Sequence, residues 1–555
     1  MNKRKIFSIL ISVSLVASLL SGCSTGKKAI VKDSATDKSP ITITFYSADG
    51  NAKSCNFSDP VSKEITKQTG VTLKMDYPVG GNTQRVPLMI ASGQYPDIIY
   101  AKGDTPKLVE AGALIPLDKM IAKSPNISSL YGKYLSRMKY SLEDPKTYTL
   151  GVYGVDGAMW NPGGLLAVQH AVLKDQGYPS IKTMKEYEDS IAAYMKKYPT
   201  INGQKTIGLS LLADDWKWLI SVGNPSGSAL GLQDNGQWAV NSNTNVATYK
   251  FMLPQMREYY RVLNDMNAKG LLDPESFTQK TDAYLAKLAS GRVLAIADAT
   301  WDYGNSVTSL VKAGTPERTW ATLPIVLDSS KQKNASMTNQ GYSASSGIGI
   351  TTSCKNPARV MAFLDWMASD KAQVLLNWGI EGTDYTIENG KRTVTAAEQT
   401  MKNNDPDYSV KTGVTLYSYP FPQRGDGVKD PSGQTYTTAS TDSITTNYNA
   451  AEKETLAAYK VTMWKDLYPK TSEFKEPAYG AAWMTNIPAD SQLNISLTKA
   501  DAESQKSIPK AILATPANFD KVWDDYQESL KKLGMEKAGA DFTKLLQDKV
   551  KLWSK

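Results

Sequence analysis

Cysteine and histidine are scarce in this chain of 555 residues, which has three cysteines and one histidine. A single histidine, His170, excludes His-rich zinc sites, and it lies in a segment that reads as plain helix, so we expect it to be structural rather than catalytic. Cys55 and Cys354 are the only cysteines after residue 23. An oxidising setting would allow a disulfide between them, and two separate buried thiols are the alternative.

Long apolar runs are also scarce, and the one run present, Ile6 to Leu20, is too short to span a membrane and is broken by serines. Lys3, Arg4 and Lys5 precede it, and Leu-Ser-Gly-Cys follows and ends at Cys23. This pattern predicts a cleaved signal peptide over residues 1–22. It resembles a bacterial lipoprotein lipobox, which implies a diacylglyceryl group on Cys23; an ordinary secretory signal with an incidental cysteine is the alternative.

Large apolar residues are few in the segment that follows, residues 23–39, which is rich in Lys, Asp, Ser and Thr. Such a composition does not fold alone and predicts a flexible linker. Since two acyl chains anchor a protein stably, we expect lipid anchoring, with palmitate among the acyl chains, at the extracellular face of the cell membrane of a Gram-positive-type bacterium. The lipid would be the protein's only contact with the membrane.

The chain has no strong charge of either sign. Its formal net charge is +8, and removal of the signal peptide takes away three positive charges and leaves +5, without the clustered basic stripe of a nucleic-acid surface. No GxxxxGK[ST] phosphate loop occurs, and Gly347-Ile348-Gly349 reads as a strand. The sequence therefore predicts neither a nucleic-acid partner nor a nucleotide cofactor, and its length predicts more than one core.

Strands and helices alternate over residues 41–100. The period-two and helical patterns predict strands at Ile41–Ser47, Val71–Tyr77 and Ile98–Tyr100, and helices at Val61–Thr69 and about Gln84–Ser92. This β-α-β-α-β order favours a mainly parallel sheet covered by helices.

Several later segments share a family resemblance when they are taken together in order. They are Ser92–Asp104, Leu108–Asp118, Tyr148–Val155, Leu288–Tyr303, Trp320–Val326, Asn377–Gly390 and Asn518–Trp523. Their order resembles the extracellular solute-binding lipoproteins of ABC importers, in the large subfamily related to maltose- and oligosaccharide-binding proteins. The resemblance covers nearly the whole mature chain.

The resemblance implies an α/β, two-lobed periplasmic-binding-protein-like fold of type II, with a ligand cleft between the lobes. It places residues 40–153 and 323–389 in the first lobe and residues 154–322 and 391–555 in the second. It implies a monomer without catalytic residues that captures carbohydrate and presents it to the transmembrane subunits of an ABC permease. Ligand binding would close the lobes by a hinge motion.

One segment departs from the family pattern. Some large relatives carry an acidic calcium loop where this chain has Tyr198 to Leu209, a stretch that contains no carboxylate. Calcium prefers several oxygen ligands, mostly carboxylates, so we predict no metal site.

Phenylalanine is scarce among the aromatic residues, with ten Phe against twelve Trp and 29 Tyr. Tryptophan and tyrosine combine an apolar face with a polar group, which suits sugar rings. Trp301 is the strongest candidate, because it follows the apparent strand Val293–Ala297, and the matching tryptophan of the family is a sugar platform. For any of these tryptophans, core packing is the alternative.

The other candidate ligand contacts are weaker. Trp216 and Trp218 would lie on one side of a strand or loop beside Asp214, and Trp160 lies in a Gly- and Pro-rich loop after the first crossover. Asp49 and Asp104 follow strands and would accept hydrogen bonds from sugar hydroxyls or cap helices instead. Trp378, Glu381 and Trp483 complete the set.

Two other functions remain open on the sequence alone. A secreted, wall-anchored glycoside hydrolase or lyase would show turnover, although 55 acidic residues make chance carboxylate pairs inevitable. Capture of a peptide or an anionic ligand is the other, because a fold does not determine its ligand.

Overall fold

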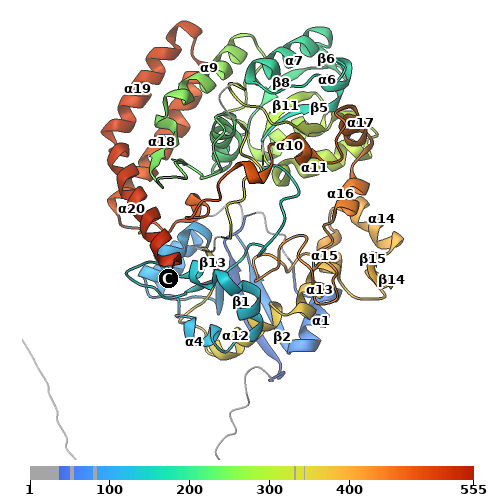
Figure 1. Cartoon of the computed structure of the whole chain (residues 1–555), viewed down its shortest axis with the longest axis vertical. Coiled ribbons are helices and arrows are strands. Elements are labelled where there is room, and N and C mark those ends of the chain that lie inside the picture. The colour runs from blue at the N-terminus through green and yellow to red at the C-terminus, as the bar shows by residue number, and fades with distance from the viewer. Residues whose placement is uncertain are drawn as a thin grey trace, which may run out of the picture.

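Two lobes, each with its own mixed sheet, form the protein in the computed structural model (Figure 1). The structure describes residues 37–50, 55–78, 84–163, 165–329, 333–342, 344 and 346–554. The predicted signal peptide, Cys23 and most of the linker lie outside these residues. Among the helices described, none has the length and apolarity to cross a membrane.

The first lobe is built on a five-stranded sheet in the order β2-β1-β3-β13-β4. Its strands are β1 (Ile41–Ser47), β2 (Val71–Asp76), β3 (Ile98–Tyr100), β4 (Thr149–Gly151) and β13 (Gly347–Ile350). β1 pairs in parallel with β2 and β3, and β13 runs antiparallel to its neighbours β3 and β4. The predicted strands are confirmed, with β2 ending one residue early.

Helix α1 (Pro60–Thr69) shows why the first helix forms where the sequence predicts it. The Asp59 carboxylate accepts a 2.9 Å hydrogen bond from the Ser62 N–H, and Pro60 occupies the first turn. Gly70 ends the helix with φ of 74°, and a Cβ there would lie 2.2 Å from the Lys38 carbonyl oxygen. Only glycine fits this position.

The remaining first-lobe elements surround this sheet. They are α2 (Arg85–Ser92), α3 (Thr105–Glu110), α4 (Asp118–Ile121), α5 (Pro125–Tyr131), α12 (Pro357–Met367), α13 (Asp370–Trp378), β14 (Tyr385–Glu388), β15 (Lys391–Val394), α14 (Ala396–Asn404) and α15 (Tyr408–Thr412).

The expected lobe boundary after residue 389 differs from the structure. Tyr408, Tyr417 and Phe421 are buried in the first-lobe core, where the rings of Phe421 and Phe45 have centroids 5.4 Å apart. Residues assigned to the second lobe by chain order therefore belong to the first, because their large apolar side chains complete its core. The chain does not return to the second lobe until α16 (Thr441–Asn447) (Figure 1).

The second lobe is built on a four-stranded sheet in the order β12-β5-β11-β8. Its strands are β5 (Leu166–Gln169), β8 (Ile207–Ser210), β11 (Val293–Ala297) and β12 (Trp320–Thr322). Its other elements are α6 (His170–Asp175), α7 (Met184–Lys197), α8 (Asn224–Ala229), β9 (Trp238–Val240), β10 (Ala247–Tyr249), α9 (Pro254–Ala268), α10 (Thr281–Ala289), α11 (Thr300–Lys312), α17 (Ala450–Ala458), α18 (Gln492–Leu513), α19 (Phe519–Lys532) and α20 (Met535–Trp553). The predicted strand Val293–Ala297 is confirmed as β11.

His170 is buried in the second lobe. Its Nδ1 forms a 2.7 Å hydrogen bond with the Thr455 hydroxyl, and its ring centroid lies 5.7 Å from that of Trp464. Burial lowers the pKa of the imidazole to about 3. The prediction that His170 is structural agrees with these contacts.

The stretch that replaces the acidic calcium loop folds as a hairpin. β6 (Thr200–Ile201) and β7 (Gln204–Lys205) pair around Asn202 and Gly203, which have φ of 51° and 75°. This is the two-residue turn for which Asn-Gly is preferred. Elsewhere too, the described residues contain no group of His, Cys, Asp and Glu able to hold a metal ion.

Cys55 and Cys354 are both free thiols, so the possible disulfide is not formed. Cys55 lies after β1, and its sulfur is 3.6 Å from the Met75 sulfur on the edge strand β2. Cys354 follows β13, which is antiparallel to β3 and therefore ends at the opposite end of the sheet. Two intervening strands and this reversed direction keep the thiols apart.

The chain crosses between the lobes after β4, after β12 and through α16. The first crossover is fixed to the first lobe, because the Val155 N–H donates to Gln423 and the Val155 carbonyl accepts from Gly425, at 3.0 and 2.8 Å. A Cβ on Gly425 would lie 2.2 Å from the Gly157 Cα, so this close approach requires glycine.

The end of α20 provides another contact between the lobes. Helix α20 packs on α18 and β10 of the second lobe, while its last turn reaches first-lobe residues 132–138. The Ser136 hydroxyl donates to the Trp553 carbonyl at 3.3 Å, and the Arg137 guanidinium lies 5.0 Å from the Trp553 ring centroid.

Candidate ligand-binding site

Trp216 and Trp301 form an exposed, stacked aromatic pair on the second lobe. Their ring centroids lie 5.8 Å apart with an interplanar angle of 17°, and their exposed fractions are 44% and 54%. Trp301 lies in the first turn of α11, directly after β11, and Trp216 lies in the turn after β8. Since β8 and β11 are parallel neighbours, their carboxyl ends bring the two indoles together.

A buried ion pair lies next to this stacked pair. The Lys217 ammonium is 2.6 Å from the Asp302 carboxylate, with side chains only 13% and 5% exposed. Lys217 and Asp302 directly follow Trp216 and Trp301 in sequence, so the pair ties the two segments together. Nearby Asp298 is buried, and burial together with the Asp302 charge raises its pKa to about 7.

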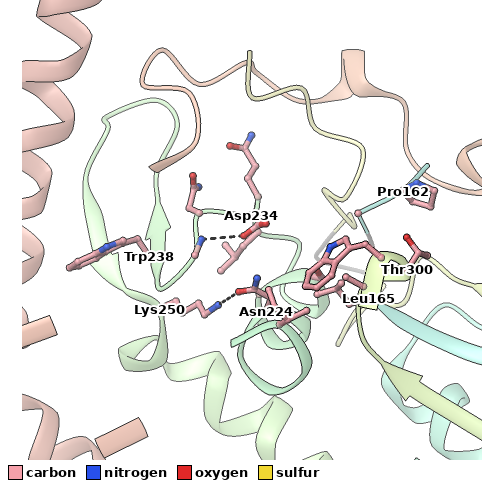
Figure 2. Close-up of a pocket in the computed structure, with 17 residues that line it drawn as sticks. Pro162, Leu165, Asn224, Asp234, Trp238, Lys250 and Thr300 are labelled. Carbon is pink, nitrogen blue, oxygen red and sulfur yellow. Dashed lines mark hydrogen bonds between the residues drawn. The ribbon is translucent and has the colours of Figure 1, made fainter. Parts of the chain in front are cut away.

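A cavity of about 210 Å³ opens beside Trp301 (Figure 2). It is lined by Pro162, Gly163, Leu165, Ile220, Asn224, Gly227, Ser228, Leu232, Gln233, Asp234, Asn235, Gly236, Trp238, Lys250, Ala299, Thr300 and Trp301. Pockets that enclose whole drug-sized ligands measure roughly 300–1,000 Å³. The cavity therefore suits one unit of a longer ligand.

Polar groups surround one end of the cavity. The Lys250 ammonium, on a residue only 3% exposed, donates a 2.8 Å hydrogen bond to Asn224 Oδ1. The Asp234 carboxylate accepts from the Gly236 N–H at 3.2 Å (Figure 2). Gln233 Oε1 is buried without a hydrogen-bond partner among the described residues. These groups can both donate to and accept from a bound polar ligand.

Trp483 extends the aromatic surface toward the first lobe. It is 45% exposed and packs directly on the cavity residue Gly236. A Cβ added to Gly236 would lie only 2.8 Å from the Trp483 Cβ. Its ring meets that of Tyr153, on the first crossover, edge to face with centroids 6.2 Å apart. Tyr153 in turn contacts Tyr419, whose hydroxyl is 2.7 Å from that of Tyr100.

The first lobe approaches the stacked pair through Lys102. Its ammonium lies 5.8 Å from the Trp216 ring centroid and 3.1 Å from the Asp49 carboxylate. Lys102 adopts φ of 51°, a conformation that is uncommon for residues other than glycine. Asp49, a predicted ligand contact, thus belongs to the first lobe. Through Lys102 it faces the predicted tryptophan contacts of the second lobe.

Two of the predicted contacts are structural instead. Trp218 is 2% exposed and packs in the second-lobe core, 5.5 Å from Phe251 between ring centroids. The segment enters a helix, where alternate side chains diverge, so Trp216 faces out and Trp218 faces in. Asp214 accepts from the Thr281 N–H and hydroxyl, both at 3.1 Å, and so caps α10.

The structure does not bring four other candidates to the cavity. The Asp104 carboxylate pairs with Lys107 at 2.7 Å on the first lobe. Trp378 donates from its indole N–H to the Thr435 carbonyl at 3.1 Å, and Glu381 is exposed near the β14–β15 hairpin. Trp160 is held in the crossover region with the Lys465 ammonium 4.8 Å from its ring centroid.

Sequence reasoning missed most of the polar groups of the cavity, including Asn224, Gln233, Asp234 and Lys250. One available signal was Lys250 itself, a charged residue between aromatic neighbours in Thr248-Tyr249-Lys250-Phe251. A lysine in such a setting is buried with a partner or lines a site. Lys102 and Tyr153 carried no distinguishing pattern.

Comparison with known proteins adds a family and a fold. The family of bacterial extracellular solute-binding proteins matches residues 56–374. The fructooligosaccharide ABC transporter substrate-binding protein FusA of Streptococcus pneumoniae is 23% identical over 349 residues, covering 58% of this chain and 60% of FusA. The sequence match thus spans less than two thirds of FusA.

Two further comparisons cover more of the chain. Lipoprotein LipO of Bacillus subtilis is 22% identical over 438 residues, covering 76% of this chain and 80% of LipO. The structure of an EF-hand mutant of S. pneumoniae FusA in complex with fructo-nystose has a TM-score of 0.68 and 18% identity, covering 91% of this chain and 99% of that one. This similarity establishes the α/β, two-lobed fold.

Proposed function

Because the chain belongs to the family of bacterial extracellular solute-binding proteins, we propose that it is the binding subunit of an ABC importer and captures an oligosaccharide. The observation that carries the proposal is the stacked, half-exposed pair Trp216 and Trp301 beside a polar cavity. Exposing two stacked indoles to water is unfavourable unless a ligand covers them. The binding of fructooligosaccharide by FusA supports the same ligand class.

The ligand would lie between the lobes. Sugar CH groups would stack on Trp301, and the outer face of Trp216 or Trp483 would hold further units. Sugar hydroxyls would bind Asn224, Gln233 and Asp234 in the second lobe and the Asp49–Lys102 pair in the first. Contacts from both lobes would favour the closed arrangement, because ligand binding stabilises the state that offers more contacts.

The proposal extends to the protein's place in the cell. A lipid on Cys23 would hold the folded lobes at the outer surface of the membrane through the linker of residues 23–39. The partners would be the carbohydrate ligand and the membrane-embedded permease subunits, with the binding protein itself monomeric and without catalytic activity. The family and the lipoprotein LipO support an exported protein of this kind.

Thermal unfolding with a panel of neutral and acidic oligosaccharides tests the proposal. A ligand present at 100 times its Kd adds about 2.7 kcal/mol to the stability of the native state, so binding raises Tm. The same mixtures are then assayed for new reducing ends. Stabilisation without turnover supports a binding protein, turnover supports the glycosidase or lyase alternative, and no stabilisation by any saccharide contradicts the proposal.

A further inference from the structure

Lys250 is a buried cation that has no carboxylate partner in the part of the chain that the structure describes. Its ammonium has three N–H donors, and the described residues supply one acceptor, Asn224 Oδ1 at 2.8 Å. Lys250 is 3% exposed and lines the cavity beside Trp301. Buried ammonium groups are normally paired with an anion, because burial of an isolated charge is costly.

No carboxylate among the described residues pairs with this charge at close range. The carboxylates that influence Lys250 electrostatically are Asp234 and Asp501, and neither forms an ion pair with it. Asp234 is exposed and accepts from Gly236, whereas Asp501 is partly buried and accepts from Gln237 and Tyr249, both at 2.9 Å. The cavity thus presents a cation without its counter-ion, next to an aromatic surface.

We propose that this cavity binds an acidic sugar unit, a uronate, whose carboxylate pairs with the Lys250 ammonium. The inference rests on the proposed oligosaccharide-binding function and narrows its ligand class. A carboxylate would accept hydrogen bonds from the two N–H groups of Lys250 that do not bind Asn224. Such charge-assisted hydrogen bonds are about twice as strong as neutral ones.

The rest of the cavity fits a sugar that bears this carboxylate. Gln233 Oε1 is buried and has no hydrogen-bond partner among the described residues, and it would accept a hydrogen bond from a sugar hydroxyl. Trp301 lines the same cavity and would cover the apolar face of the ring. The volume of about 210 Å³ fits a single unit, so the remaining units would extend over the exposed indoles.

The pairing of Lys250 with a carboxylate makes the affinity for the acidic ligand depend on pH. Burial lowers the pKa of Lys250 to about 7, opposed by the charges of Asp234 and Asp501, and the pKa of Asp501 is itself raised by burial to about 6. A uronate carboxylate is ionised throughout this range. Binding would therefore take up a proton, and affinity for the acidic ligand would fall about tenfold between pH 6 and pH 8.

Calorimetric titration tests the inference with matched ligands. The probes are trimers of galacturonate, glucuronate, mannuronate and guluronate, each compared with its carboxyl-reduced, neutral counterpart. The variants are Lys250→Met and, as a matched control, Lys549→Met. Lys549 is also buried with a pKa lowered to about 7, and it lies on α20 and does not line the cavity. Repeating the wild-type titration in buffers of different ionisation enthalpy measures proton uptake without any variant.

We expect at least one uronate trimer to bind tenfold or more tightly than its neutral counterpart, with proton uptake, in wild type and Lys549→Met. Lys250→Met should remove that preference while retaining the neutral ligand. Equal affinity for both members of every pair, or an unchanged preference in Lys250→Met, overturns the inference. Neutral binding with no uronate binding also overturns it and leaves the proposed function intact, whereas failure of all saccharides overturns both.

Discussion

The Lys217 ammonium and the Asp302 carboxylate lie 2.6 Å apart next to the stacked pair of Trp216 and Trp301. Each partner is the residue directly after one of the two tryptophans. The exposed aromatic pair therefore rests on a buried ionic contact, and the orientation of the indoles depends on groups that a ligand would not touch.

Lys217→Met should destabilise the protein by about 3–5 kcal/mol, because it leaves the Asp302 carboxylate buried without its counter-ion. Urea unfolding measures the loss. The double variant Lys217→Met/Asp302→Leu should regain much of it, since neither partner of this ion pair then remains buried without the other. A matched control is Lys185→Met, which removes the exposed Lys185–Asp189 pair, with side chains 70% and 60% exposed, and should cost less than about 1 kcal/mol. Equal effects of the two single variants would contradict the buried-pair interpretation.

Trp301→Ala should weaken oligosaccharide binding by about 2 kcal/mol or more, as expected for an aromatic contact at the centre of a site. It should change the free energy of unfolding by less than about 1 kcal/mol, because the indole is 54% exposed. Trp218→Ala is the control. Its indole is 2% exposed, so truncation should cost about 3–5 kcal/mol of stability. Affinity and unfolding midpoint, measured together for both variants, separate the two roles. A large stability loss with unchanged affinity in Trp301→Ala would remove Trp301 from the site.

His170 should remain neutral throughout the pH range in which the protein is folded. Its folded pKa of about 3 lies below the unfolded value of about 6.5, so the unfolded state binds more protons between these values. The stability linked to His170 is thus present above pH 6.5 and is lost as pH falls, at up to about 1.4 kcal/mol per pH unit. Because the chain has one histidine, its imidazole NMR signals report this directly. They should not titrate between pH 8 and 5, and His170→Asn should flatten the decline of unfolding free energy over that range. A midpoint near pH 6.5 in the folded protein would contradict the burial of His170.

Cys55 and Cys354 should both react with a thiol reagent in unreduced protein that starts after Cys23. Unfolded protein should give two thiols, since neither cysteine is bridged. In the folded protein Cys354 should react slowly at pH 8, because burial raises its pKa to about 11 and the thiolate is the reactive form. Reducing agent should leave Tm unchanged, whereas a count of zero thiols would establish the bridge.

Cys23→Ala should move the protein from the membrane fraction to the medium if a lipid on Cys23 is its anchor. The measurement is the distribution of the protein between fractions in a producing cell. Cys55→Ala, which leaves the lipobox intact, is the control and should remain with the membrane. Membrane association that survives Cys23→Ala would contradict lipid anchoring.

The sequence was most informative where local chemistry decides the structure. The alternation of Ile41–Ser47, the stop at Gly70 and the apolar run Val293–Ala297 predicted β1, the end of α1 and β11. Trp301 was predicted as a ligand contact because it follows a strand in its own segment and because the family resemblance points to the same residue, and this contact stays a prediction.

Long-range contacts were beyond the reach of the sequence. Trp216 and Trp218 read alike in sequence, and their roles are separated by the start of a helix between them and by the packing of Phe251 on Trp218. Lys250 faces a cavity assembled from distant segments, and Tyr417 and Phe421 join the first-lobe core from a part of the chain assigned to the second. In each case, the deciding contacts come from residues far away in the chain.

The last turn of α20 connects the two lobes at a point separate from the crossovers of the chain. A rotation of one lobe against the other would have to break the contact between Trp553 and Arg137 or move residues 132–138 with the helix. This contact would therefore restrain a hinge motion of the lobes at a helix that is far in sequence from every crossover. Removal of the last turn of α20 should therefore ease the motion of the lobes and leave every proposed ligand-contacting residue in place.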